Sequence, residues 1–283
     1  MHELTLHEIQ QESLKVLLKL DALCRELNIR YFLAFGTLIG AIRHNGFIPW
    51  DDDIDVMMLR KDYQILKNYM DAHADEMRPF RICDRANTKN YSASIPRFVN
   101  TDFTFRTRNP GEKQFTLGVF VDIYPLDNCG NSVSEGKKLG KKVRLLDKLY
   151  IIYINSSNGR KDAKNLVRHI ISAVLKLLWG KHFDFDTKLT TYITKKTSDN
   201  DNYIGVLYDC DPMKRTQFEK PIEHLFEGYT VFIPEDYDSI LNLTHKGYML
   251  LPPESERVPH HSYSIYREDT LNTPMKNGER EGD

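Results

Sequence analysis

Apolar residues recur every three to four positions over residues 6–27, and this spacing predicts an amphipathic helix. Thr5 precedes the pattern and Glu8 follows three positions later, which is the arrangement of a capping box. We therefore expect a long helix that begins after Thr5 and packs its apolar face on the core.

The next segment predicts a short buried strand followed by a short helix. The strand covers YFLAF at 31–35 and leads into Gly36 and Thr37. The helix covers 38–43 and ends at Asn45, a residue that tolerates the left-handed conformation found at helix ends. The backbone N–H groups of Gly36 and Thr37 would then point out of a helix N-terminus, an arrangement that suits a phosphate.

Residues 51–59 alternate in the manner of a strand. In this pattern Asp53 and Asp55 share one face, while Ile54 and Val56 enter the core on the other. Along a strand the two aspartates would stand about 6.6 Å apart, close enough to share metal ions.

The remaining pattern predicts an α+β protein of several parts. Further helices are expected over 61–77, 132–154, 162–180, 184–198 and 234–241, strands over 79–83, 92–99, 101–106 and 115–124, a turn at 109–111, and a hairpin over 222–233 that turns at Glu227 and Gly228. We expect a catalytic core at 1–130, a basic helical region at 131–200, a part that completes the catalytic domain at 201–270, and a disordered tail at 271–283.

Charge and composition narrow the function classes. The 283 residues carry a net charge of −1, which gives no reason to expect nucleic acid as a partner. Residues 137–181, however, hold twelve Lys or Arg and two Asp, a net charge of about +10. The four cysteines are widely spaced, and no signal peptide or 18-residue apolar stretch is visible, so we expect a cytoplasmic protein with free thiols.

Asp51, Asp52, Asp53 and Asp55 place four carboxylates within five positions. Two like charges 4 Å apart repel by about 4 kcal/mol at an effective dielectric constant of 20. Most acidic runs are solvated turns, but this one follows a glycine turn and continues into a strand. A divalent cation is the candidate for the missing positive charge.

A single further acid, Asp122, lies in the β-rich run FTLGVFVDIY at 115–124. A glycine turn at a helix N-terminus, an Asp-hydrophobic-Asp strand and a later Asp on another strand are the components of a nucleotidyltransferase-type metal site. We therefore expect a nucleotidyltransferase-like mixed β-sheet core with a helical accessory region.

Several segments together resemble the LicD family of phosphorylcholine transferases, whose relatives include the fukutin-like ribitol-phosphate transferases. These are FGTLIGAIRHNGFIPWDDDIDV at 35–56, VDIYPLD at 121–127, FEG at 226–228, DYDSIL at 236–241 and HKGYMLLPPESERVPHH at 245–261. The resemblance implies transfer of phosphorylcholine from CDP-choline to a sugar hydroxyl of a bacterial surface glycopolymer, of teichoic acid or lipopolysaccharide type, or of its lipid-linked precursor, with release of CMP.

The resemblance also implies roles for individual residues. Asp53, Asp55 and Asp122 match the metal ligands of the family, for Mg²⁺ or alternatively Mn²⁺, and we rank Asp51 and Asp52 as supporting acids. The chain departs from the family pattern at 245–248, where HKGY replaces a Tyr-Gly-Asp-Tyr type of run. This departure weakens any catalytic role at that position.

Each candidate substrate-binding residue is about equally consistent with a purely structural role. Arg97 and Arg43 suit nucleotide phosphates because a guanidinium is a bidentate donor, but either is also consistent with a surface arginine. Trp50 would suit the choline ammonium or the cytosine, and is equally consistent with a packing role. Tyr124 is a weaker candidate for an aromatic cage around choline.

The base that accepts the proton of the acceptor hydroxyl is open among Asp127, His260 and His261. The histidine pair also suggests zinc, but adjacent histidines on an extended chain point in different directions and no cysteine lies near them in sequence.

The basic stretch 137–181 is consistent either with helices that pack on the core or with a patch that docks on the anionic inner face of the cell membrane. Three alternatives to phosphorylcholine transfer remain open. They are transfer of ribitol phosphate or glycerol phosphate from the CDP derivative, a metal-dependent glycosyltransferase, and a non-catalytic choline-polymer binding protein. The oligomeric state is unknown from the sequence.

Overall fold

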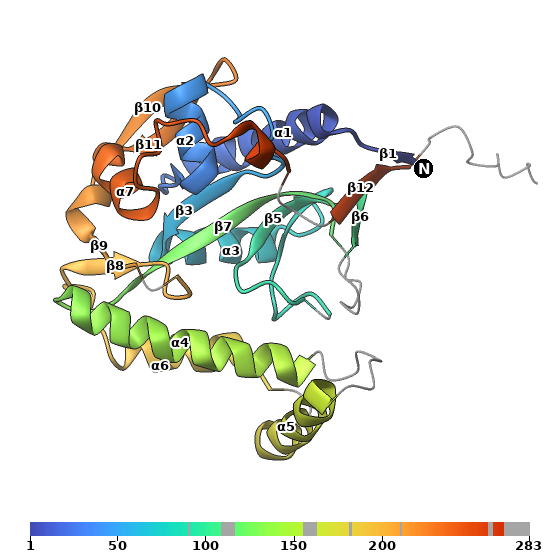
Figure 1. Ribbon diagram of the computed structural model, residues 1–283, viewed down its shortest axis with the longest axis vertical. Helices are drawn as coiled ribbons and strands as arrows, with labels where there is room; N and C mark the ends of the chain where they lie inside the picture. The colour runs from blue at the N-terminus through green and yellow to red at the C-terminus, as the bar shows by residue number, and fades with distance from the viewer. Residues whose placement is uncertain are drawn as a thin grey trace, which may run out of the picture.

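The centre of the protein is a mixed β-sheet. The structure, a computed structural model, describes residues 1–89, 91–108, 117–154, 163–180, 183–209, 211–259 and 263–268. In sheet order the strands are β2 (Phe32–Leu33), β3 (Asp55–Leu59), β7 (Val119–Asn128), β5 (Arg97–Asn100) and β4 (Phe80–Cys83), while β8 (Tyr203–Gly205) pairs with the end of β7 and with β9 (Met213–Lys214). Strands β3 and β7 are parallel and the other pairs are antiparallel (Figure 1).

Three helices pack around this sheet, namely α1 (Leu6–Glu26), α2 (Phe35–His44) and α3 (Arg60–Ala72). The predicted capping box is confirmed, because Oγ1 of Thr5 accepts the N–H of Glu8 and Oε2 of Glu8 accepts the N–H of Thr5. The predicted end of α2 is also confirmed, with Asn45 in the left-handed conformation. These local signals act within one turn of a helix, so the sequence alone reveals them.

Two smaller sheets complete the fold. The first has the order β1 (His2–Glu3), β12 (Tyr263–Arg267) and β6 (Phe103–Thr107), which brings the C-terminal strand next to the N-terminus. The second is the hairpin of β10 (Pro221–Phe226) and β11 (Tyr229–Pro234), followed by α7 (Tyr237–Thr244). The hairpin turns at Glu227 and Gly228 as predicted. Short 3₁₀ helices cover Arg215–Phe218 and Glu254–Glu256.

The helical region has its own apolar core on the far side of β8. It consists of α4 (Val133–Ile154), α5 (Ala163–Trp179) and α6 (Phe185–Thr194), and Figure 1 shows α5 farthest from the central sheet. Helix α5 packs mainly on α4, through residues such as Leu175 and Ile171. The sequence therefore predicted the α+β class and the helical accessory region correctly. The four domain boundaries stay a prediction.

Several predicted boundaries were wrong by a few residues. Strand β3 begins only at Asp55 rather than at residue 51, and β7 covers 119–128 rather than 115–124. Helix α2 begins at Phe35, before the predicted residue 38, and α3 ends at Ala72. Aspartate disfavours strands, which explains why the acidic run itself is irregular.

Three of the predicted free thiols are confirmed, since Cys24, Cys83 and Cys129 are buried and unbonded. The predicted turn at 109–111 and the tail from 271 lie outside the described residues. Within the described chain, none of the helices combines the length and apolar character that crossing a bilayer requires.

Candidate active site

Asp53, Asp55 and Asp122 converge at the junction of β3 and β7. Asp55 and Asp122 are paired positions of these parallel strands, so their side chains emerge on the same face of the sheet. Asp53 precedes β3 and supplies a third carboxylate, and one oxygen from each of the three lies within 4.8 Å of the others. All three residues are buried.

The electrostatics of this trio favour a bound cation. Burial, together with the charges of Asp53, Asp122 and Asp51, raises the pKa of Asp55 well above its usual value. Oδ1 of Asp55 is buried and has no hydrogen-bond partner among the described residues. Three carboxylate oxygens form a hard donor set of the kind that Mg²⁺ and Mn²⁺ prefer. The residues present therefore fit the expected metal.

A second acidic trio shares Asp53 with the first. Carboxylate oxygens of Asp51, Asp52 and Asp53 also lie within 4.8 Å of one another. The predicted alternation of a strand does not extend to Asp51, Asp52 and Asp53, because β3 begins only at Asp55 and residues 51–53 are irregular. Asp51 and Asp52 thus stand beside the predicted ligands.

The first turn of α2 supports the acidic segment. The Thr37 hydroxyl accepts the backbone N–H of Asp55 at 2.8 Å. A Cβ at Gly36 would lie 2.8 Å from Oδ2 of Asp51, so the absence of a side chain permits this close approach. The structure thus places Gly36 and Thr37 next to the carboxylates. Their contact with phosphate stays a prediction.

Arg97 lies opposite Asp122 at paired positions of β5 and β7. Its Nε is 2.5 Å from Oδ1 of Asp122, and its guanidinium carbon lies 4.0 Å from the ring centroid of Phe120. Burial disfavours the charged guanidinium, but the Asp122 carboxylate outweighs burial and raises the pKa of Arg97. Arg97 therefore holds the Asp122 carboxylate in place, an interaction that its sequence position did not reveal. Its predicted contact with nucleotide phosphates stays a prediction.

Two tyrosines complete the walls of the site. Tyr124 lies two positions after Asp122 on the same face of β7, and burial, followed by the charges of Asp55 and Asp122, raises the pKa of Tyr124. The Tyr263 hydroxyl donates to the carbonyl of Asp52 at 2.9 Å across a sequence separation of 211 residues. Tyr124 follows Asp122 by two positions, which is a usable sequence signal. No local pattern could have indicated Tyr263.

Arg43 and Trp50 already have partners within the protein. Nη1 of Arg43 donates to the carbonyls of Tyr248 and Leu250, at 2.8 and 3.2 Å. The guanidinium carbon of Arg257 lies 5.7 Å from the ring centroid of Trp50, so a cation of the protein already faces this indole. The structure brings neither residue into contact with the carboxylate trio. Their substrate-binding roles stay predictions.

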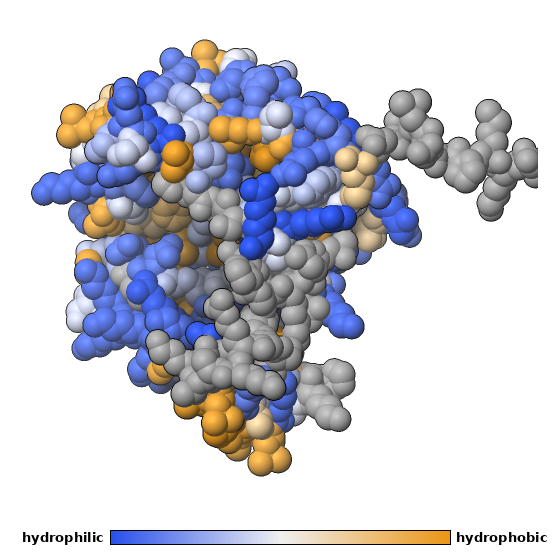
Figure 2. Space-filling model, turned by 45° about the vertical axis from the view of Figure 1, so that its right-hand side comes forward, coloured by the Kyte–Doolittle hydropathy of each residue, from blue (hydrophilic) through white to orange (hydrophobic). Residues whose placement is uncertain are grey.

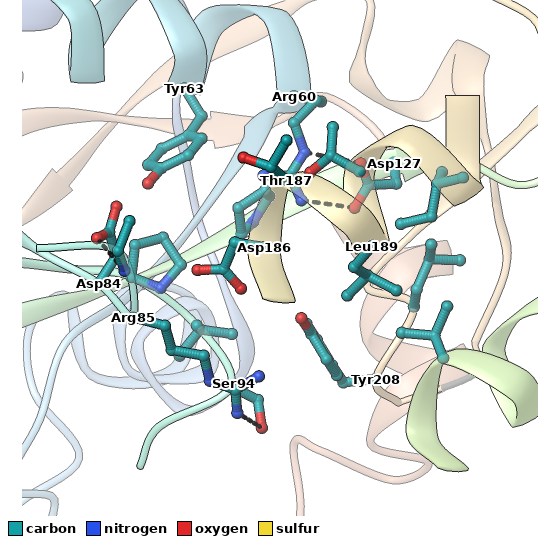
Figure 3. A pocket seen from close by; sticks show the side chains of 18 of the residues that line it. Arg60, Tyr63, Asp84, Arg85, Ser94, Asp127, Asp186, Thr187, Leu189 and Tyr208 are labelled. Carbon is teal, nitrogen blue, oxygen red and sulfur yellow. Dashed lines mark hydrogen bonds and ion pairs between the residues drawn. The ribbon is translucent and has the colours of Figure 1, made fainter. Parts of the chain in front are cut away.

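The structure does not bring Asp127 to the carboxylate trio. Asp122 and Asp127 are five positions apart on β7 and point to opposite faces. Nε and Nη2 of Arg60 each donate to Asp127 at 2.7 Å. Asp127 lines a cavity of about 300 Å³ between α3, α6 and the segment 84–96, together with Asp186 and Tyr208 (Figure 3). His260 and His261 lie outside the described residues.

A mixed sheet that carries an Asp-hydrophobic-Asp segment and a third aspartate on the adjacent strand defines a protein of the nucleotidyltransferase class. Residues 28–139 match the family described as LicD/FKTN/FKRP, nucleotidyltransferase domain. The chain is 31% identical over 274 residues to the lipopolysaccharide cholinephosphotransferase LicD of Haemophilus influenzae, a match that covers 94% of this chain and 99% of the relative. The chain belongs to the LicD family.

A second relative is more distant. It is an uncharacterized protein of Rickettsia prowazekii, 27% identical over 169 residues, which cover 53% of this chain and 58% of the relative. The resemblance seen in the sequence motifs is therefore confirmed at the level of the family.

Proposed function

We propose that this protein transfers phosphorylcholine from CDP-choline to a sugar hydroxyl of a bacterial surface glycan, of lipopolysaccharide or teichoic acid type, or of its lipid-linked precursor. The observation that carries the proposal is the buried Asp53, Asp55 and Asp122 trio, with its unpartnered oxygen on Asp55. The name of the Haemophilus relative, a cholinephosphotransferase that acts on lipopolysaccharide, supports the choline and glycan assignments.

The proposed step is a displacement at phosphorus. The acceptor hydroxyl oxygen forms a bond to the phosphorus that carries choline, the bond from this phosphorus to the bridging oxygen breaks, and CMP leaves with that oxygen and the bonding electron pair. The proton of the hydroxyl passes to a base, for which His260 and His261 stay the candidates, because Asp127 points to the opposite face of β7 and is paired with Arg60. The products are the phosphorylcholine-substituted sugar and CMP.

We assign a separate role to each residue of the site. Asp53, Asp55 and Asp122 would hold Mg²⁺ or Mn²⁺, which supplies positive charge to the diphosphate when bound. Arg97 holds Asp122, and Thr37 holds the backbone at Asp55. The N-terminus of α2 at Gly36 would face a phosphate oxygen, since the first backbone N–H groups of a helix have no acceptor within the helix.

The test is release of CMP. Purified protein with Mg²⁺, CDP-choline and a lipid-linked glycan precursor should yield CMP and a product heavier by phosphorylcholine, as measured by mass spectrometry. Asp53→Ala should abolish both signals without loss of thermal stability, because a repelling carboxylate is removed. Release of no CMP from CDP-choline, CDP-ribitol or CDP-glycerol would overturn the catalytic assignment. Faster turnover of CDP-ribitol or CDP-glycerol than of CDP-choline would mean that the protein transfers that alcohol phosphate instead of phosphorylcholine. Release of a nucleoside diphosphate would indicate a glycosyltransferase.

A peripheral position on the anionic inner face of the cell membrane is part of the same proposal. Helix α5 exposes Leu177 and Leu178 at 85% and 71%, together with Leu166, Val167, Ile170 and Val174. Figure 2 shows this apolar surface at the end of the molecule that α5 occupies in Figure 1. Basic residues of α4 and α5 accompany it, which suits a surface of anionic lipid. Such docking would bring a cytoplasmic enzyme to a lipid-linked acceptor.

A further inference from the structure

A cavity of about 320 Å³ lies beside Met57 of β3 and Phe35 at the start of α2. Its apolar wall consists of Met57, Val206 and Met213, all of which are buried. Two rings, those of Phe35 and His245, form another side. This apolar side of the cavity therefore offers a surface suited to methyl groups.

The cavity adjoins the metal site along the same face of the sheet. Asp55 pairs with Asp122 across β3 and β7, and Met57 pairs with Tyr124 two positions further along both strands. Side chains two positions apart lie on one face and about 6.6 Å from each other along the strand. The phosphorus and nitrogen of phosphorylcholine are roughly 5 Å apart at standard bond lengths. A phosphate at the carboxylates would thus place the ammonium group at Met57.

Aromatic rings stand where the ammonium group would lie. The ring centroids of Phe35 and Tyr124 are 4.8 Å apart, and those of Phe35 and His245 are 6.1 Å apart, both in edge-to-face arrangements. Phe35, the first residue of α2, has a φ of +44°. This left-handed conformation is unusual for an aromatic residue. Aromatic faces attract quaternary ammonium groups through the negative charge of their π systems.

Two carboxylates, those of Asp209 and Asp211, line the exposed side of the cavity. Partial burial, followed by the charge of Asp211, raises the pKa of Asp209, and the nearby charge of Arg144 offsets this in part. A cation in the cavity would relieve the repulsion between them, whereas an anion would add to it. The charge of the cavity is thus complementary to an ammonium group.

We propose that this cavity binds the trimethylammonium group of CDP-choline, with Phe35 as its aromatic wall and Asp209 and Asp211 as its counter-charges. The inference rests on the proposed function and assigns the alcohol specificity of the site to these residues. It moves choline recognition away from Trp50, whose ring already faces the guanidinium of Arg257. The cytosine base is the alternative occupant of the cavity, and CDP-glycerol, which shares this base but lacks the ammonium group, separates the two.

The test measures binding of CDP-choline and CDP-glycerol to the full chain in Mg²⁺ by titration calorimetry. The double variant Asp209→Asn with Asp211→Asn, and separately Phe35→Leu, should weaken CDP-choline binding about tenfold and leave CDP-glycerol binding within twofold of the original protein. Asp102→Asn, which neutralises an exposed aspartate on the turn between β5 and β6, serves as the control for the loss of a surface carboxylate and should change neither dissociation constant. Melting temperatures verify that each variant is folded.

Three outcomes would overturn the inference. Equal weakening of CDP-choline and CDP-glycerol binding in the variants would assign the cavity to the cytosine base. Unchanged binding of both compounds would show that the cavity is not part of the substrate site. Failure of the original protein to bind CDP-choline would show that CDP-choline is not its ligand. This last failure would overturn the proposed function as well, whereas binding of CDP-choline without release of CMP when acceptor is supplied would overturn the proposed function alone.

Discussion

Arg97 and Asp122 face each other across the antiparallel strands β5 and β7, with Nε of Arg97 2.5 Å from Oδ1 of Asp122. The two side chains are largely buried, at 15% and 7% exposure. This pairing neutralises one carboxylate of the trio within the protein itself, whereas Oδ1 of Asp55 is buried without a hydrogen-bond partner among the described residues. The ion pair therefore lowers the positive charge that the site needs from a bound cation.

Replacement of Arg97 by methionine should lower the free energy of unfolding by about 3 kcal/mol, because it leaves Asp122 buried without its partner. The matched control is Arg78→Met, since Arg78 pairs with Asp75 on the surface and both side chains are mostly exposed. This variant should lose less than about 1 kcal/mol of its free energy of unfolding. Urea denaturation measures both values. Millimolar Mg²⁺ should restore part of the loss in Arg97→Met, and equal losses in the two variants would contradict the role of the ion pair.

Asp55→Asn should stabilise the metal-free protein and remove its activity. The raised pKa of Asp55 shows that the folded protein favours an uncharged group at this position, and asparagine is the uncharged isostere. Thermal melting in EDTA should give a higher midpoint than the original protein, and Mg²⁺ should no longer raise it. A lower midpoint in EDTA would show that the charge of Asp55 is satisfied within the protein.

The Thr37 hydroxyl should matter as a hydrogen-bond acceptor rather than for its size. Thr37→Val keeps the shape of the side chain but leaves the buried N–H of Asp55 without an acceptor, at a cost of about 1–3 kcal/mol. Thr37→Ser retains the acceptor and should lose clearly less. Urea denaturation of the two variants checks the difference, and equal losses would mean that the methyl group, not the hydroxyl, stabilises this turn.

Asp186 should make stability depend on pH in a defined direction. Burial raises the pKa of Asp186 from 3.8 to about 6, so the folded state holds a proton that the unfolded state loses near pH 3.8. The original protein therefore loses stability as the pH rises from about 4 to 6, and the full loss is present above pH 6. Asp186→Asn avoids this loss.

The gain in Asp186→Asn should accordingly be absent below pH 4 and reach at most about 3 kcal/mol at pH 7.5, from 1.36 kcal/mol for each pKa unit. The free energy of unfolding of both proteins, measured across this range, checks the prediction. Asp102→Asn is the exposed control and should show no such growth. A gain that does not vary with pH would contradict the link to ionisation.

Helix α5 should bind anionic vesicles through its exposed leucines. Leu177→Glu with Leu178→Glu should reduce co-sedimentation with phosphatidylglycerol vesicles at least tenfold, because it adds negative charge and removes apolar area from the face that would enter the lipid. Leu243→Glu is the matched control, a leucine of α7 that is 54% exposed. Absence of vesicle binding by the original protein at low salt would reject the membrane proposal.

The sequence by itself determined the features that depend on neighbouring residues. The apolar period of α1, its capping box at Thr5, the left-handed end of α2 at Asn45 and the hairpin turn at Gly228 each follow from conformational preferences within a few positions. The proximity of Asp53 and Asp55 follows for the same reason. Such preferences also indicated the α+β class and the helical region.

Only the tertiary structure determined which distant residues come into contact with these local features. The order β2-β3-β7-β5-β4 aligns Asp55 with Asp122 and Asp122 with Arg97, and the return of β12 brings Tyr263 to Asp52. Strand order results from the packing of distant apolar faces, which no periodicity of 2 or 3.6 residues encodes. For the same reason the sequence could suggest Trp50 for choline but could not show the cavity beside Phe35.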